Sequence, residues 1–296
     1  MPQRALELDA PAKINLYLGV HTQTDERGYH RVDTVMARLG LADRVHIEPA
    51  SELSVALSPA IDLAPERNSA WRAAHLLGEA VSRSPAVAIH VEKRIPLCAG
   101  LGGPSTDAAA VLRGLCELWG IDPLDEHVLA VARAIGADVP FFLGESPAYL
   151  AGAGDVLAET FDMPGALPVV LVKPCGCGVS APEAYRCFDA RPCAAAPLEP
   201  MLTALRAQDA AGMVASVSNN LAPAARQLAP QIAHVLAWLR EQAGVLVAEV
   251  SGSGSSSFAI CASAEVAAAI AEGADQQGWW SYATQMEKTG SIPIAG

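Results

Sequence analysis

Positive charge and long apolar runs are scarce in this sequence. Its 20 Lys and Arg residues stand against 32 Asp and Glu, which gives a net charge of −12, and the basic residues form no run. Proteins that bind nucleic acid gather cations against the phosphates, so we expect no nucleic-acid partner. No stretch reaches the roughly 18 apolar residues of a membrane-spanning helix. The first residues do not resemble a signal peptide, and we therefore predict a cytoplasmic protein without a membrane partner.

Paired cysteines of the kind that bind zinc are also missing. The 7 cysteines contain no CxxC pair, and Cys175-Gly176-Cys177 has no second Cys or His pair to complete a site. We therefore expect no zinc centre. An odd number of cysteines without a secretion signal indicates reduced thiols and not a disulfide framework.

Strands and helices mix along the chain without strict βαβ alternation, which predicts an α+β fold in both halves. The 296 residues suffice for two domains, and the pattern loosens between Gly152 and Gly165. We therefore divide the chain into domains 1–160 and 161–296. The expected helices are Ser69–Ser82 with Asn68 as its cap, Pro123–Ile135 ending at Gly136, Ala181–Phe188, several within Leu198–Ala243, and Glu265–Gln277.

Alternating and β-branched stretches predict the strands. Ala5–Val20 is expected to form two short strands broken at Ala10-Pro11, and two more are expected to flank a turn near Ala42-Asp43. The other expected strands are Ala86–Arg94, Pro168–Val172, Val245–Val250, Phe258–Cys261 and Trp279–Met286. The residues from Gly290 are expected to form a loose tail.

A glycine loop that leads into a helix is the most informative stretch. Gly100–Gly103 is followed by Pro104–Asp107, all of them residue types that begin helices, and then by apolar residues at helical spacing. Unpaired amides and the positive end of the helix dipole meet at such a junction, which suits phosphate. The loop matches neither a Walker loop nor the dinucleotide fingerprint. Taken alone, it could also be an ordinary glycine-rich turn.

Two charged residues elsewhere are candidates for chemistry. Lysine occurs only at Lys13, Lys93, Lys173 and Lys288. In an alternating strand Lys13 and Asn15 share one face, which fits either an exposed strand or a site. Asp138 lies beside the apolar stretch Val139–Phe142, where it could be a turn acid or a catalytic group.

Three separated segments resemble the GHMP kinases, the small-molecule kinases named for galactose, homoserine, mevalonate and phosphomevalonate. They are PAKINLYLGV, IPLCAGLGGPSTDAAA and VSGSGSSSFAI, in this order. PAKIN followed by GYH and later GADVPFF is similar to the branch that phosphorylates 4-diphosphocytidyl-2-C-methyl-D-erythritol in the non-mevalonate isoprenoid route. The resemblance implies a two-domain fold, with an N-terminal domain like ribosomal protein S5 and a ferredoxin-like C-terminal α/β sandwich, and an active site in the cleft between them.

The resemblance also implies roles for individual residues. It implies ATP-dependent phosphorylation of the 2-hydroxyl of that substrate, with Asp138 as general base and Lys13 as its electrostatic partner. Residues implied for the cytidine substrate are Asn15, Tyr29, His30 and Tyr185. Residues implied for ATP are Pro96, Leu97, Cys98, Ala99, Gly100, Leu101, Gly102, Gly103, Pro104, Ser105 and Thr106, with Asn68 near the adenine. Phosphoryl transfer also leads us to expect Mg²⁺ as a cofactor. The sequence does not identify its ligands, and Ser105 or Thr106 with phosphate oxygens and water is a hypothesis. A monomer or weak homodimer is expected.

Two alternatives stay open at this point. Another GHMP kinase of the homoserine or mevalonate type would share the glycine loop but would not need Tyr29, His30 or Tyr185. A non-catalytic nucleotide-binding protein would not need Lys13 and Asp138. The sequence also departs from the resemblance at Cys98-Ala99, where the family usually has more glycine, and at Pro104, which removes one amide donor.

Overall fold

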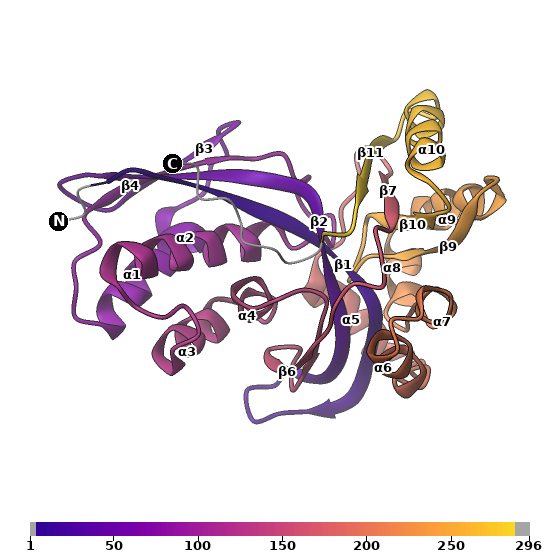
Figure 1. The fold of residues 1–296 in the computed structure, drawn as a ribbon, viewed down its shortest axis with the longest axis horizontal. Helices are drawn as coiled ribbons and strands as arrows, with labels where there is room; N and C mark the ends of the chain where they lie inside the picture. The colour runs from indigo at the N-terminus through magenta and orange to yellow at the C-terminus, as the bar shows by residue number, and fades with distance from the viewer. Residues whose placement is uncertain (1–3, 288–296) are drawn as a thin grey trace.

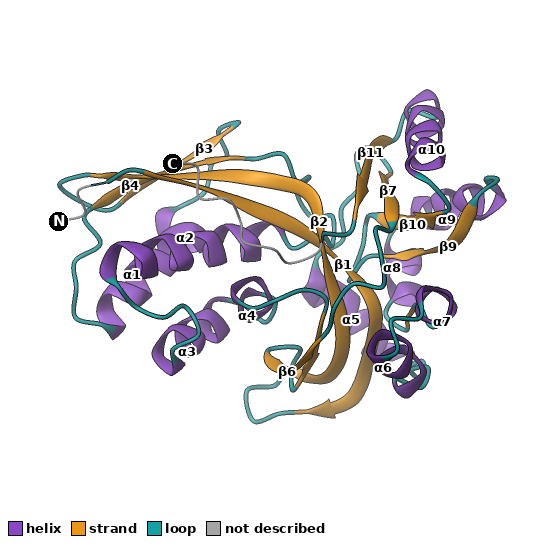
Figure 2. Ribbon diagram, in the orientation of Figure 1, coloured by secondary structure: helices purple, strands orange, loops and turns teal. Residues whose placement is uncertain are grey.

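The computed structural model describes residues 4–287 and contains two β-sheets with helices packed on them (Figures 1 and 2). The first sheet has the order β3-β4-β2-β1-β8, and β5 pairs with both β2 and β6. Its strands are β1 Leu6–Thr24, β2 His30–Pro49, β3 Ser54–Ser58, β4 Val87–Glu92, β5 Ala148–Ala151, β6 Val156–Thr160 and β8 Ser218–Asn219.

The β1–β2 hairpin is longer and more continuous than predicted. The break expected at Ala10-Pro11 is wrong, because β1 continues through it and the pairing with β2 only shifts register between Pro11 and Lys13. The turn expected near Ala42-Asp43 is also wrong, since β2 runs through both residues. Asp43 is fully buried, and its carboxylate accepts hydrogen bonds from the backbone N–H groups of Arg94 and Ile95. A tertiary partner therefore holds a turn-type residue inside a strand.

Four helices gather under one face of the first sheet (Figure 1). They are α1 Ser69–Ala80, α2 Gly103–Trp119, α3 Glu126–Ile135 and α4 Val139–Leu143, and a short 3₁₀ turn η1, Pro65–Arg67, precedes α1. Small residues along α2, including Ala108 and Gly114, are buried. They let this helix lie close to the sheet, since a Cβ on Gly114 would come within 2.5 Å of the Ile47 side chain. Asn68 caps α1 as predicted, accepting from the amides of Ala70 and Trp71.

The second sheet is antiparallel with the order β11-β7-β10-β9. Its strands are β7 Pro168–Lys173, β9 Val245–Val250, β10 Ser257–Cys261 and β11 Trp280–Gln285. This order, with helices between β7 and β9 and again between β10 and β11, is the ferredoxin-like arrangement that the resemblance implies. The helices are α5 Ala181–Ala190, α6 Glu199–Arg206, α7 Ala210–Ala215, α8 Ala222–Leu228, α9 Gln231–Glu241 and α10 Ala264–Gln276. The strands and helices of this half together confirm the predicted α+β class, and all four strands predicted here are present.

The two halves share a hydrophobic core. One face of the second sheet packs on α5, α8, α9 and α10. The other face contributes Val169 and Phe258 to a cluster that also holds Ile14 and Leu16 of β1. In addition, β8 pairs in parallel with β1, although it lies in the second half of the sequence. The division at residue 160 therefore stays a prediction, and the tail expected from Gly290 lies outside the described residues.

A buried charge cluster fixes the entry to the glycine loop. The ammonium group of Lys93, which directly follows β4, contacts the carboxylates of Asp43 and Asp107. The three side chains are at most 7% exposed. Burial is the main cause that raises the pKa of Asp107 to about 7; the charge of Asp43 adds to it and Lys93 opposes it. The cluster therefore ties β2, β4 and the first turns of α2 to one cation.

Replacing Lys93 by Met should lower the free energy of unfolding by about 3–5 kcal/mol, because two buried carboxylates would lose their counter-ion. Urea unfolding at neutral pH measures this loss. The neighbouring Arg94→Met is the matched control, since the Arg94 side chain is 54% exposed and its removal should change stability by at most about 0.5 kcal/mol. Equal unfolding midpoints for the two variants would show that the cluster contributes nothing.

Candidate active site

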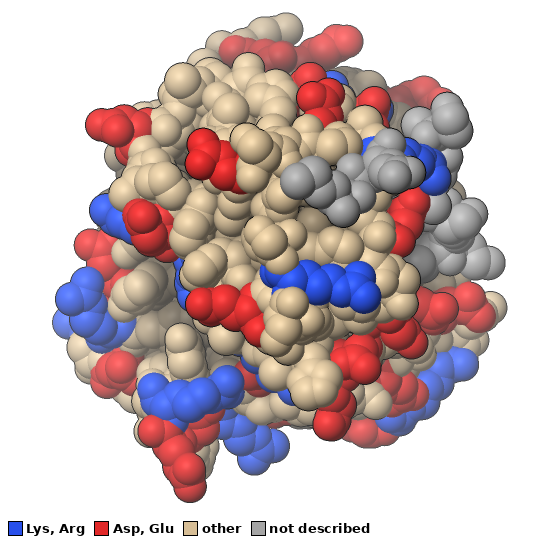
Figure 3. Space-filling view, turned by 90° about the vertical axis from the view of Figure 1, so that its left-hand side faces the viewer, with Lys and Arg blue, Asp and Glu red and all other residues tan. Residues whose placement is uncertain are grey.

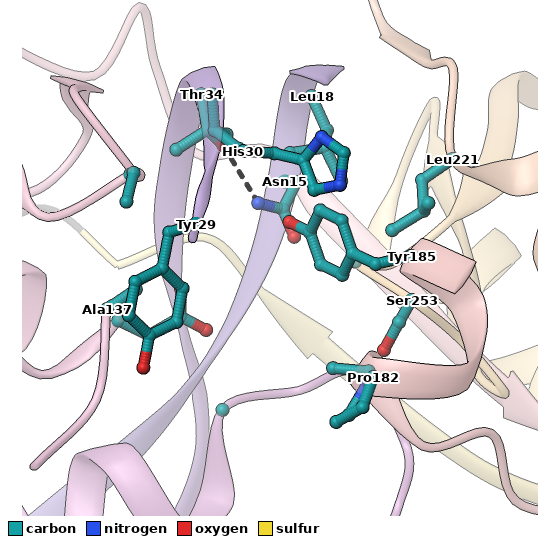
Figure 4. Close-up of a pocket in the computed structure, with 18 of the residues that line it drawn as sticks. Asn15, Leu18, Tyr29, His30, Thr34, Ala137, Pro182, Tyr185, Leu221 and Ser253 are labelled. Atoms are coloured by element: carbon teal, nitrogen blue, oxygen red, sulfur yellow. Dashed lines mark hydrogen bonds between the residues drawn. The ribbon is translucent and has the colours of Figure 1, made fainter. Parts of the chain in front are cut away.

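A cavity of about 560 Å³ lies where the two halves meet (Figure 4). Nine of the residues predicted for the site line it: Lys13, Asn15, Tyr29, His30, Gly100, Gly102, Ser105, Asp138 and Tyr185. They come from β1, the turn into β2, the glycine loop, α2, the start of α4, and α5. The third motif contributes Gly252 and Ser253. Segments far apart in the sequence thus converge on one cavity.

Lys13 and Asp138 form an ion pair at the wall of this cavity. The Lys13 side chain is only 5% exposed, and its Nζ lies 3.3 Å from Asp138 Oδ2. Nζ also donates to Asn15 Oδ1 at 2.8 Å, and Asn15 Nδ2 donates to Thr34 Oγ1 at 2.9 Å. Thr34 in turn donates to the Tyr17 carbonyl. This chain of hydrogen bonds across the β1–β2 hairpin holds the ammonium group in place.

The carboxylate of Asp138 is available to a ligand. Asp138 occupies the N-cap position of α4, yet its side chain makes no capping hydrogen bond. It is 34% exposed, and Lys13 is the partner that the structure gives it. The helix-cap interpretation of this acid, left open by the sequence, therefore has no support in the geometry, whereas a role at the cavity does.

The glycine loop directs its amides and its carbonyls differently. The carbonyls from Cys98 to Gly102 all accept hydrogen bonds. In contrast, no N–H from Gly100 to Gly103 donates to another residue in the described part of the chain, 4–287. Gly100 and Gly102 have φ of +74° and +77°, the left-handed region that favours glycine. The loop therefore leaves a row of free donors at the start of α2, as an anion site requires.

The third motif holds the glycine loop from the other half of the molecule. Ser251 Oγ donates to the Gly100 carbonyl at 3.0 Å, and the Ser256 N–H donates to the Ala99 carbonyl at 3.1 Å. Ser255 donates to the Cys98 carbonyl through both its N–H and its hydroxyl. A Cβ on Gly100 would lie 2.1 Å from the Ser251 carbonyl oxygen, so the approach requires glycine there.

The backbone at Cys98 shows why the family usually has glycine in this part of the loop. Its φ is +50°, a conformation that few residues other than glycine adopt. Pro104 is exposed at the first turn of α2 and its carbonyl accepts from Ser69 Oγ at 2.6 Å, which brings the start of α1 against the loop. The amides of Ser105 and Thr106 already bond to the Gly102 carbonyl.

Tyr29, His30 and Tyr185 line a part of the cavity that we call its aromatic end (Figure 4). Tyr29 is 57% exposed in the turn before β2, and Arg27 lies 5.2 Å from its ring centre. His30 stacks on Tyr185 of α5, with ring centres 5.3 Å apart and planes 21° apart. Burial, followed by the charge of Asp138, raises the pKa of Tyr185. In Figure 4, Tyr29 and Tyr185 come from opposite sides.

The two ring nitrogens of His30 have different partners. Nδ1 lies 2.8 Å from the His21 carbonyl, so it must carry the proton that this contact needs. Nε2 lies 3.2 Å from Asp189 Oδ1, and the Asp189 side chain is 53% exposed at the cavity. Nε2 and Asp189 therefore form the polar edge of the aromatic end.

The other nine predicted residues are not among those that line the cavity: Asn68, Pro96, Leu97, Cys98, Ala99, Leu101, Gly103, Pro104 and Thr106. Asn68 uses its side-chain oxygen to cap α1, so a contact with adenine stays a prediction. Thr106 is fully buried, and its Oγ1 has no partner among the described residues. Sequence reasoning missed Thr34 and Asp189. Asp189 could have been found, because it lies four residues after Tyr185 and hence on the same face of a helix, whereas nothing local distinguishes Thr34.

Comparisons with known proteins identify the family of the chain. The profile for the GHMP kinases N terminal domain matches residues 68–145, and that for the GHMP kinases C terminal matches residues 201–278. The 4-diphosphocytidyl-2-C-methyl-D-erythritol kinase of Paramagnetospirillum magneticum is 36% identical over 95% of this chain and 99% of that protein. The chain belongs to the GHMP kinase family. The kinase of the same name from Pelotomaculum thermopropionicum is 39% identical over 88% of the chain and 91% of that protein.

Solved structures of other proteins share the fold of this GHMP kinase. A crystal structure of 4-(cytidine 5′-diphospho)-2C-methyl-D-erythritol kinase superposes with a TM-score of 0.77 at 35% identity, over 96% of this chain and all of that one. A homoserine kinase from Cytophaga hutchinsonii gives a TM-score of 0.73 at 18% identity, over 97% of this chain and 96% of that one. This second likeness concerns the fold alone. Together they confirm the predicted two-domain GHMP kinase fold.

Surface properties add two observations. No helix within residues 4–287 has the length and apolar character to cross a membrane. Figure 3 shows acidic and basic side chains interspersed over one end of the molecule, with no continuous basic area on that face.

Replacing Gly102 by Val should raise the ATP KM about 10- to 100-fold, because displaced loop amides bind phosphate poorly. The new Cβ would lie 3.0 Å from Lys13 Cγ and 3.0 Å from Phe142 Cζ. Gly120→Val is the matched control, since Gly120 ends the same helix with φ of +67° and open space around it. An unchanged KM in a folded Gly102→Val protein would move the phosphate site elsewhere, to the Gly252–Gly254 loop.

Proposed function

We propose that this GHMP kinase transfers the γ-phosphoryl group of ATP to the 2-hydroxyl of 4-diphosphocytidyl-2-C-methyl-D-erythritol. The proposal rests mainly on one arrangement: the Lys13–Asp138 pair lines the same cavity as the glycine loop and the aromatic end. The relatives named for this activity, at 36% and 39% identity over most of their length, support the choice of substrate. The cytoplasmic location and the monomeric or weakly dimeric state expected from the sequence stay predictions.

ATP binds through the backbone of the glycine loop in this proposal. The free N–H groups from Gly100 to Gly103 and the dipole of α2 receive the phosphates. The contact between Ser69 and Pro104 places Asn68 near this loop, which supports the predicted adenine side of the site. Pro104 offers no N–H, so phosphate contacts depend on the glycine amides and on the Ser105 hydroxyl.

The phosphoryl acceptor is activated by Asp138. Its carboxylate takes the proton of the substrate hydroxyl as the oxygen attacks phosphorus. Lys13 neutralises charge on the transferring group, and the hydrogen bond to Asn15 keeps its ammonium group aimed at the cavity. Because Lys13 is buried, water screens these interactions little.

Mg²⁺ fits the oxygen donors near the loop. Ser105 lines the cavity and can offer its hydroxyl as a ligand beside phosphate oxygens and water. Thr106, the other predicted ligand, is fully buried and fits less well. When bound, the ion supplies charge neutralisation and alignment of the phosphates.

The aromatic end receives the cytosine base. Tyr29 and Tyr185 provide faces for stacking, and His30 with Asp189 provides a polar edge. An aspartate can accept from the 4-amino group of cytosine, and the exposed Asp189 side chain is placed to do so. Homoserine or mevalonate has no aromatic base that could stack on Tyr29 or Tyr185.

Turnover should fall about 10²- to 10⁴-fold in Asp138→Asn, because the carboxamide cannot accept the proton. A coupled assay of ADP release with CDP-methylerythritol measures it, and ATP titration should give nearly wild-type affinity. The exposed Asp162→Asn serves as control. Retention of more than about a tenth of wild-type turnover, with chemistry rate-limiting, excludes Asp138 as base. The same assay with homoserine and mevalonate tests the substrate, since a preference for either would overturn the proposed function.

Tyr29→Ala should weaken CDP-methylerythritol binding about 5- to 150-fold, since stacking of a base on an aromatic ring is worth about 1–3 kcal/mol. ATP affinity should be unchanged. Tyr282→Ala removes a similarly exposed tyrosine on β11 and serves as the control. Calorimetric titration with each ligand separates the outcomes. Unchanged affinity for the cytidine substrate would exclude the pocket, and equal losses for both ligands would indicate a folding defect.

A further inference from the structure

Two imidazoles and a carboxylate share the face of the first sheet that points away from its helices. His46 of β2 lies directly opposite His90 of β4, and Glu92 follows His90 by two residues. Side chains alternate along a strand, so the three project on one side. The alternate residues on these strands, among them Val45 and Val91, are buried against the helices.

The ligand atoms of these side chains are already close together. One nitrogen of each imidazole and one oxygen of the carboxylate lie within 4.8 Å of one another. His46 Nε2 is 3.5 Å from Glu92 Oε1, and the two imidazole rings stack with centres 5.9 Å apart. Ligand atoms around a tetrahedral Zn²⁺ are separated by about 3.3 Å, given bonds of about 2.0–2.1 Å. Small side-chain rotations therefore suffice to close the set around one ion.

We infer that His46, His90 and Glu92 bind a divalent transition-metal ion of the Zn²⁺ class, with water in the fourth position. Two imidazole nitrogens and one carboxylate oxygen suit Zn²⁺, Ni²⁺ or Co²⁺, whereas Mg²⁺ and Ca²⁺ prefer all-oxygen sites. This site is separate from the proposed active-site Mg²⁺, and it does not depend on the proposed function. It also differs from the cysteine-based zinc centre that the sequence argued against.

Neighbouring charges leave the carboxylate available. Arg94 approaches the other oxygen of Glu92, Oε2, at 3.5 Å, and both side chains are more than two-fifths exposed. An exposed pair of this kind is weak and yields readily to a metal ion. The second nearby arginine, Arg44, lies opposite Glu92 but is engaged by Glu7 and Asp9. One carboxylate oxygen of Glu92 thus faces His46.

The chain contains a matched pair that lacks the second imidazole. His75 and Glu79 on α1 lie one helical turn apart, with Nε2 and Oε1 3.4 Å from each other. The distance is nearly that of His46 and Glu92, yet two ligands on one helix bind an ion less well than three from two strands. His75→Ala is therefore the control for His90→Ala.

An ion at this site would cross-link the side chains of two strands, β2 and β4, that are already paired through their backbones. An ion that binds the folded chain and not the unfolded one raises the unfolding temperature with its concentration. β4 passes directly from Glu92 to Lys93 and the glycine loop. The ion would therefore stabilise the strand that delivers the chain to the active site.

Calorimetric titration of the full, chelator-treated chain with Zn²⁺ tests the assignment. Wild type and His75→Ala should bind one ion with equal affinity, and His46→Ala and His90→Ala should lose at least about 100-fold. The unfolding temperature should rise with Zn²⁺ only in the first two proteins. Circular dichroism confirms that each variant is folded. No stoichiometric binding by wild type, or equal binding by His90→Ala and His75→Ala, overturns the site.

The absorption spectrum of bound Co²⁺ distinguishes binding at this site from binding at the cysteines. Co²⁺ bound to wild type should give the visible bands of a tetrahedral nitrogen and oxygen site, and these bands should vanish in His90→Ala. A strong thiolate-to-cobalt charge-transfer band that persists in His90→Ala would place the ion on cysteine and overturn the inference. Excess Mg²⁺ should not displace the bound Co²⁺, and displacement would also count against it.

Discussion

An anion-binding loop must keep its amides unbonded while its backbone stays fixed, and the fold depends on how this conflict is resolved. Hydrogen bonds to its carbonyls fix the loop, and the buried side chains of Ala99 and Leu101 anchor it in the hydrophobic core. Three serines of the second half donate hydrogen bonds to loop carbonyls: Ser255 to Cys98, Ser256 to Ala99 and Ser251 to Gly100. The backbone N–H of Lys13 donates to the Leu101 carbonyl at 3.0 Å. The carbonyls from Cys98 to Gly102 are all bonded while the amides from Gly100 to Gly103 are not, so the loop backbone is preorganised to receive an anion.

This arrangement also explains why Lys13 has two functions at one position. Its backbone fastens β1 to the loop, and its side chain pairs with Asp138. The buried cluster around Lys93 supports the same loop from the side of β4. In an acidic chain with few lysines, two of them thus lie at or beside the proposed phosphate site. The negative remainder of the surface would repel polyanions but leaves these enclosed positions unaffected.

Local signals predicted the elements that depend on local physics. The Asn68 cap, the glycine-rich start of α2 and the strands of the second sheet follow from capping, turn and alternation patterns. The errors at Pro11 and Asp43 have one cause, since residues that favour turns were retained in strands by partners distant in sequence. The short pairing of β8 with β1 has no pattern of its own and could not be read from two residues.

The residues of the candidate site could be predicted largely through family resemblance, while their geometry could not. Nothing local distinguishes Asp138 from a helix cap, and only the absence of a capping bond in the structure does so. The pairing of His30 with Asp189, and the stacking of His30 on Tyr185, depend on how α5 docks against the β1–β2 hairpin. Such contacts come from tertiary packing, which single-sequence patterns do not encode.

The parallel pairing of β8 with β1 has a mechanical consequence. A strand from the second half is hydrogen-bonded into the first sheet. In addition, Ser255 and Ser256 of the second half donate hydrogen bonds to the carbonyls of the glycine loop. A hinge between the halves would have to break both connections at once. Opening the halves would therefore cost more free energy than rotating the exposed side chains at the mouth of the cavity, among them Tyr29 and Asp189.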